Sequence, residues 1–145
     1  MSLNDWLKFG WLAEHKTTTE EIRELLGIVE RDLVDAGLEA LSDDWKLNIA
    51  YNAALQAATA ALAACGYRAA REAHHYRVIQ SLRDTIGAPA NLVARLDVFR
   101  KKRNQGGYER AGAISEQEAQ EMIELAREID TTVRRWFADH CPELL

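Results

Sequence analysis

The chain has 145 residues, of which 48% are hydrophobic and 28% charged, and its formal net charge is −5. We expect one globular domain over residues 1–145, because a chain of this length buries a single core and the composition lacks the bias of disordered or fibrous proteins. The acidic balance argues against non-specific coating of DNA, and two cysteines are too few for a disulfide framework, which favours the cytoplasm.

The first 16 residues predict a short arm and not a signal peptide. Charged residues there are interspersed with Trp6, Trp11 and Leu12, so the long apolar run of a leader is missing. We expect residues 4–15 to form a short helix or turn that lays these side chains on the rest of the protein. At the other end, residues 139–145 are expected to form a loosely held tail.

Helical periodicity and capping residues predict five main helices. No segment alternates strictly between apolar and polar residues, so we expect no strand. Thr18 and Ser115 are each followed three residues later by Glu, which is the pattern of a capping box at a helix start. The expected helices cover roughly residues 18–36, 43–65, 91–104 and 116–138, with the third helix between the second and the fourth starting somewhere in 71–75 and ending at 87. Their short connections are typical of an all-α, up-and-down bundle.

The second of these helices carries an unusual density of alanine. Nine of the 17 residues from Ile49 to Cys65 are alanine, and no residue from Leu47 to Tyr67 is charged. The segment is too weakly apolar for a membrane span, so we expect no membrane association. Small side chains let neighbouring backbones approach closely, which predicts a central helix packed on more than one side. A bulky residue at Ala54 or Ala58 is expected to cost about 1–3 kcal/mol.

Two adjacent histidines, His74 and His75, begin the third helix. Adjacent positions on a helix point about 100° apart, so the pair does not converge on one metal ion, and His15, His140 and Cys141 add no recognised ligand spacing. We expect no metal and no cofactor. The histidines are interpreted as capping the helix or contacting Tyr67 and Arg68, and as candidate anion-binding residues.

The fourth helix ends in a basic run, Arg100-Lys101-Lys102-Arg103, before the glycines at 106 and 107. From Arg95 to Arg110 there are six Lys or Arg and two Asp or Glu, a local charge of +4 on an acidic protein. A compact cationic spot of this kind indicates a place for a phosphate or another anion. Arg100 and Lys101 are candidate anion-binding residues, although they and Lys102 also fit a solvated basic face.

Arg103 is the strongest candidate, because it continues the apolar stripe of Leu92, Leu96 and Phe99. A guanidinium on an inward stripe needs a partner. It could form a buried or interfacial ion pair, bind an anion at a cleft, or reach out to solvent. Asn104 could cap the helix, and the hydroxyl or ring of Tyr108 could contact a phosphate or a base.

The segment from Ala50 through the alanines to Gly66-Tyr67-Arg68, followed by His74 and His75, resembles the HEPN (higher eukaryote and prokaryote nucleotide-binding) superfamily. Arg103-Asn104 is similar to the start of that family's Arg-x4–6-His motif. The resemblance implies a helical bundle that forms a homodimer. It also implies a metal-independent endoribonuclease, often a toxin paired with a nucleotidyltransferase-like partner protein, in which Arg103, Asn104 and Tyr108 would occupy the catalytic positions.

Tyr108 stands where the motif places its histidine. A tyrosine with a pKa near 10 is a poor base at neutral pH, so losing the histidine could lower the rate on the order of 10²–10⁴-fold. We therefore favour a non-catalytic or weakly active HEPN-like module that binds RNA, a nucleotide or a partner protein through a cleft near Arg103. An active endoribonuclease and a purely structural dimerisation domain are the alternatives.

Overall fold

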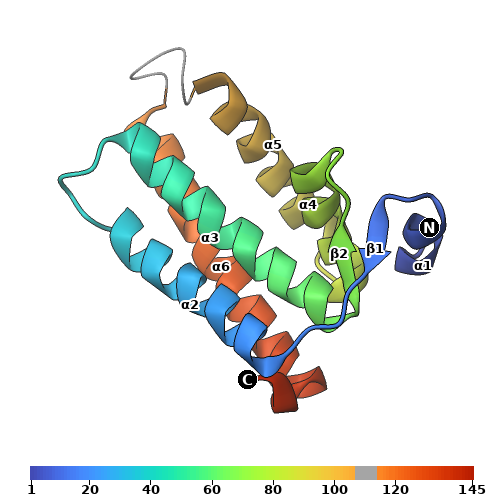
Figure 1. Ribbon diagram of the computed structural model, residues 1–145. Coiled ribbons are helices and arrows are strands. Elements are labelled where there is room, and N and C mark those ends of the chain that lie inside the picture. Colours follow the sequence, from blue (N-terminus) through green and yellow to red (C-terminus); the bar gives the residue numbers. More distant parts are fainter. Residues whose placement is uncertain (107–113) are drawn as a thin grey trace.

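The computed structural model describes residues 1–106 and 114–145, and within them the chain forms six α-helices and two short strands. Helices α2 to α6 coincide with the five expected helices, which confirms the all-α bundle (Figure 1). In chain order the elements are α1 (Leu3–Lys8), β1 (Leu12–Glu14), α2 (Thr19–Ala36), α3 (Asp43–Ala64), β2 (Tyr67–Ala69), α4 (His74–Thr85), α5 (Ala90–Gly106), α6 (Glu116–His140) and the 3-10 helix η1 (Pro142–Leu144).

Hydroxyl caps set the starts of three long helices. The Ser115 hydroxyl accepts from the Glu118 backbone N–H at 3.0 Å, and the Glu118 carboxylate accepts in return from the Ser115 N–H at 3.2 Å, which completes a capping box at α6. At the start of α3, the Ser42 hydroxyl accepts from the Trp45 backbone N–H, without a returning carboxylate. At α2 the box is half formed, because the Glu21 carboxylate accepts from the Thr17 hydroxyl at 2.7 Å.

Helix α3 is the centre of the bundle. Its alanines and large apolar side chains are buried together, and α2, α4, α5 and α6 all pack against it. Ala54, Ala57 and Ala58 are completely inaccessible to solvent. The alanine-rich sequence thus produces the many-sided packing expected of it, and α4 and α5 pack on each other as well as on α3.

The expectation of no strand was wrong. Strands β1 and β2 form a two-stranded antiparallel sheet in which Leu12 pairs with Ala69 and Glu14 with Tyr67. Each strand has three residues, too few to show alternation, and the pairing joins segments more than 50 residues apart in sequence. The sheet ties the N-terminal arm (residues 1–16) to the end of α3.

The arm and the C-terminal residues both pack on the bundle. Trp6 and Leu12 are each 3% exposed, as expected for side chains laid against the core. Residues 139–145 differ from the expected loose tail: η1 follows α6, and Cys141 and Leu144 pack against the core. Over the described ranges, none of the helices combines the length and the apolar character that crossing a bilayer requires.

Candidate functional site

Arg103 sits on α5 with neutral partners. Its Nε donates to Asn48 Oδ1 on α3 at 3.0 Å, and its guanidinium carbon lies 5.3 Å from the centre of the Tyr51 ring. Among the described residues no carboxylate lies within 4.0 Å of this guanidinium. The ion pair that the sequence left open is therefore not made with any described carboxylate, and the side chain remains partly exposed.

The other cations of the basic run are paired. Arg100 Nε donates to Asp97 Oδ1 at 2.7 Å, and Lys101 Nζ lies 3.6 Å from Asp97 Oδ2. Lys102 reaches across to Glu118 on α6. Arg103 thus differs from its three neighbours, because within the described structure its positive charge has no nearby carboxylate to neutralise it.

Tyr51 connects Arg103 to a histidine. The Tyr51 hydroxyl and His75 Nδ1 are hydrogen-bonded at 3.2 Å, and the two ring centres are 5.9 Å apart. Tyr51 is 1% exposed, and burial raises its pKa to about 12, so the hydroxyl stays protonated. Burial lowers the pKa of His75, and the positive charges of Arg103, His74 and Arg100 lower it further. Both effects favour the neutral form of His75.

The two histidines separate as their helical positions require. Ala73, in the left-handed conformation at φ 52, is the N-cap residue of α4 and directly precedes the two histidines. His75 turns inward to Tyr51, whereas His74 is exposed and borders a cavity of about 240 Å³ that Tyr67 and Arg68 also line. His74 shares this cavity with Tyr67 and Arg68, the residues that a histidine was expected to contact, and the contact of His75 with Tyr51 was not anticipated.

The side chains of two expected site residues, Asn104 and Tyr108, lie outside the described part of the structure. The backbone of Asn104 belongs to α5, whereas the whole of Tyr108 lies outside the described residues. The expected cleft beyond Arg103 depends on them. Conversely, Asn48 and Tyr51 were not predicted as site residues. Their spacing of three positions places them on one face of α3, but it does not point to Arg103.

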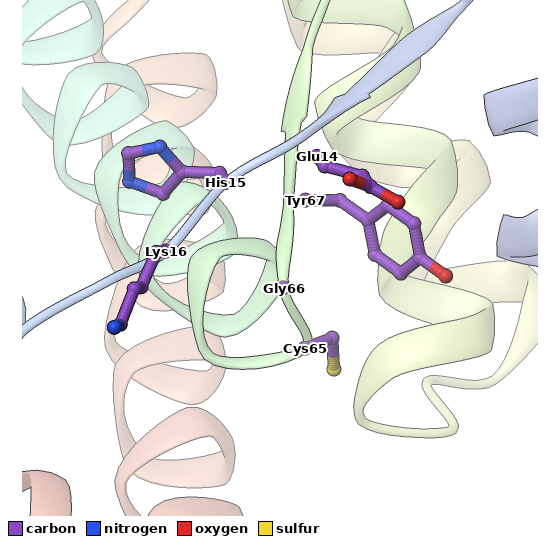
Figure 2. Close-up of a pocket in the computed structure, with 6 residues that line it drawn as sticks. All are labelled: Glu14, His15, Lys16, Cys65, Gly66 and Tyr67. Carbon is purple, nitrogen blue, oxygen red and sulfur yellow. The ribbon is translucent and has the colours of Figure 1, made fainter.

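A second hollow lies beside the two-stranded sheet. Figure 2 shows this pocket, of about 530 Å³, with His15 and Lys16 on one side, Glu14 and Tyr67 on the other, and Cys65 at the end of α3. Burial raises the pKa of the Cys65 thiol to about 11, so it stays protonated and is a weak nucleophile. Across residues 1–106 and 114–145, no three His, Cys, Asp or Glu side chains are grouped to hold a metal ion.

A family model for the HEPN domain matches residues 22–136. The chain belongs to the HEPN family. The matched span contains Asn48, Tyr51, His75 and Arg103, so the whole described site lies within the HEPN domain, whereas the N-terminal arm precedes the span. A comparison with curated proteins and one with solved structures each gave no match.

Proposed function

We propose that this HEPN domain binds RNA, with Arg103 contacting a backbone phosphate. One observation carries the proposal: a partly exposed guanidinium, held in place by Asn48 and Tyr51, has no described carboxylate to neutralise it. A guanidinium offers several N–H donors in a planar fork that fits two phosphate oxygens, and Asn48 occupies only Nε.

Nearby charges favour an anion at the same place. Arg100 is paired with Asp97, but its positive charge still lowers the pKa of both Tyr51 and His75, so it adds to the effect of Arg103 on one small region of the α3–α4–α5 face. The rest of the protein has a net negative charge, which disfavours non-specific binding of RNA over the whole surface. Binding through one or two phosphates is expected to be modest in strength and sensitive to salt.

A second candidate, a metal-independent ribonuclease, is favoured by the position of His75. When the 2′-oxygen of RNA attacks the phosphate, a 2′,3′-cyclic phosphate forms and the bond to the 5′-oxygen breaks, with the released 5′-oxygen taking a proton from water. This step needs a group that accepts the 2′-hydroxyl proton and a cation that stabilises the charge developing on the phosphate. A neutral imidazole with a lowered pKa is a suitable acceptor at pH 7, and Arg103 supplies the cation. The role requires the tautomer in which His75 Nδ1–H donates to the Tyr51 oxygen, which leaves Nε2 free to accept.

One set of variants separates these functions from a purely structural role. Binding of fluorescein-labelled oligouridylate is measured by anisotropy, and cleavage is followed on denaturing gels in EDTA, for the wild type, Arg103→Ala and His75→Gln. Arg127→Ala is the matched control. Arg127 is exposed on α6 and lies about two helical turns before Arg134, whose guanidinium donates to the Leu26 carbonyl oxygen on α2. Arg127 is therefore on the side of α6 that faces α2, and not on the side that faces α5.

Each function predicts a different pattern. An RNA-binding module binds without cleavage and loses affinity only in Arg103→Ala. A ribonuclease cleaves, and both Arg103→Ala and His75→Gln abolish cleavage while His75→Gln still binds. If Arg103→Ala changes only the thermal stability or the oligomeric mass, neither proposal holds and the residue serves the structure or the assembly.

A further inference from the structure

A continuous chain of aromatic rings and guanidinium groups runs along one side of the molecule. We call it the aromatic track, and it consists of Phe9, Trp11, Arg77, Tyr76 and Arg100. The Phe9 and Trp11 ring centres are 4.9 Å apart, and the Arg77 guanidinium lies 3.6 Å from the centre of the Trp11 ring. Arg77 and Arg100 each lie 5.4 Å from the Tyr76 ring centre, so Tyr76 links α4 to α5.

The track leads to the Arg103 site. Arg100 precedes Arg103 by three residues, nearly one helical turn of α5, and Tyr76 follows His75 directly on α4. Figure 1 shows α5, α4, the two strands and α1 following one another along one side of the bundle. The far end of the track, Phe9 and Trp11, belongs to the N-terminal arm, which precedes the span matched by the HEPN family.

Exposure marks the track as more than a packing contact. Phe9 is 54% exposed and Tyr76 is 37% exposed, and both are large rings. The stacking of Arg77 on Trp11 explains how the arm is held on α4, but it gives no reason for exposed rings on either side of it. Among the described residues no carboxylate lies within 4.0 Å of the Arg77 guanidinium, whereas Arg100, at the other end of the track, is paired with Asp97.

We propose that the aromatic track binds the bases of a single-stranded RNA whose phosphate is held at Arg103. Alternation of exposed rings and guanidinium groups is what an unpaired strand requires: every base has a face that stacks on a ring, and the cations follow the backbone. The proposal rests on the proposed RNA binding and extends it, because it assigns the N-terminal arm a part in recognising unpaired RNA.

The test compares a long and a short RNA. A fluorescein-labelled uridine dodecamer spans both the track and the Arg103 site, whereas an unlabelled uridine dinucleotide that competes with it reaches the Arg103 site alone. Phe9→Ala is expected to raise the Kd of the dodecamer about 5-fold or more, because stacking on one aromatic side chain has roughly that value. The competing dinucleotide is expected to keep its inhibition constant.

Three further variants test whether a loss of affinity in Phe9→Ala comes from the loss of an aromatic ring. Tyr76→Ala removes a second exposed ring and is also expected to raise the Kd of the dodecamer. Phe9→Trp keeps an aromatic ring at this position and is expected to retain the tight binding of the wild type. Val34→Ala is the matched control, because Val34 is 69% exposed on α2, a helix outside the track. Thermal denaturation followed by circular dichroism checks that every variant is folded.

The outcomes separate this proposal from the one on which it depends. If Arg103→Ala weakens binding of both RNAs while Phe9→Ala and Tyr76→Ala leave the dodecamer unaffected, the track is overturned and RNA binding stands. If the wild type binds neither RNA, both proposals fail. If Phe9→Ala changes the oligomeric mass in light scattering without changing RNA affinity, the exposed rings form an interface between copies of the chain and the track is overturned.

Discussion

Arg103 and His75 contact the same buried residue, Tyr51, although they come from different helices. The guanidinium lies over the Tyr51 ring and the imidazole bonds its hydroxyl. Tyr51 belongs to α3, the helix on which both α4 and α5 pack, so the packing of the bundle fixes the position of a cation relative to an imidazole. The geometry of this pair is thus a property of the core and does not depend on a flexible surface contact.

Removing only the Tyr51 hydroxyl tests this connection. Tyr51→Phe keeps the ring beneath Arg103 but leaves His75 Nδ1 without its partner, so we expect a loss of about 1 kcal/mol in the free energy of unfolding. Urea denaturation measures it as a lower midpoint with an unchanged m-value. RNA affinity is expected to change little, and a large loss of affinity would show that the hydroxyl itself contacts RNA.

His75 predicts a specific dependence of stability on pH. Its pKa is lowered in the folded protein, so the unfolded chain binds more protons around pH 6 and the free energy of unfolding falls as the pH drops from 7 toward 5. His75→Gln should flatten this decline, with His74→Gln as the matched control. Denaturation at a series of pH values provides the measurement; an equally steep decline in His75→Gln would assign it to other groups.

The charge of Arg103 should be visible at His75. Because the positive charge of Arg103 lowers the pKa of His75, Arg103→Gln is expected to raise that pKa toward its ordinary value, while burial still holds it below. Titration of the imidazole proton resonances by NMR checks this shift. A pKa of His75 that is the same in both proteins would mean that the two side chains are electrostatically independent in solution.

A buried carboxylate joins α2 to α3. Asp32 is 5% exposed, and it accepts from Asn52 Nδ2 at 2.7 Å and from Arg31 Nε at 3.0 Å. Asn52→Leu leaves a buried oxygen without its donor, so we expect a cost of about 1–3 kcal/mol. Gln56→Ala is the matched control, because Gln56 bonds the opposite end of Asn52 and not the carboxylate. Equal midpoints in urea for Asn52→Leu and wild type would contradict this reading.

The sequence predicted the helices well because their signals are local. Thr18 and Ser115 cap where the pattern placed them, and the apolar period of α2, α4 and α6 follows from the chain alone. The sheet was missed because the pairing of Leu12 with Ala69 depends on tertiary packing and leaves no alternation to detect. Helix caps and apolar periodicity therefore predict the fold class of this chain, but they do not predict the strand pairing of the N-terminal arm.

The site was predictable only in part. Arg103 stood out because a cation continued an apolar stripe, and His75 stood out as a histidine at a helix start. Their meeting at Tyr51 could not be inferred, because Tyr51 resembles an ordinary core residue in an alanine-rich helix and the contacts span 24 residues or more. Single residues can be nominated from sequence, but their grouping requires the packing of α4 and α5 on α3.

The salt dependence of RNA binding tests the role of Arg103 most directly. The affinity for a uridine dodecamer is measured over a range of salt concentrations for the wild type, Arg103→Gln and Arg127→Ala. We predict that Arg103→Gln binds RNA more weakly and that the slope of log K against log salt becomes shallower by about 0.7, the value for one phosphate contact on a single strand. An unchanged slope and affinity in Arg103→Gln would contradict it.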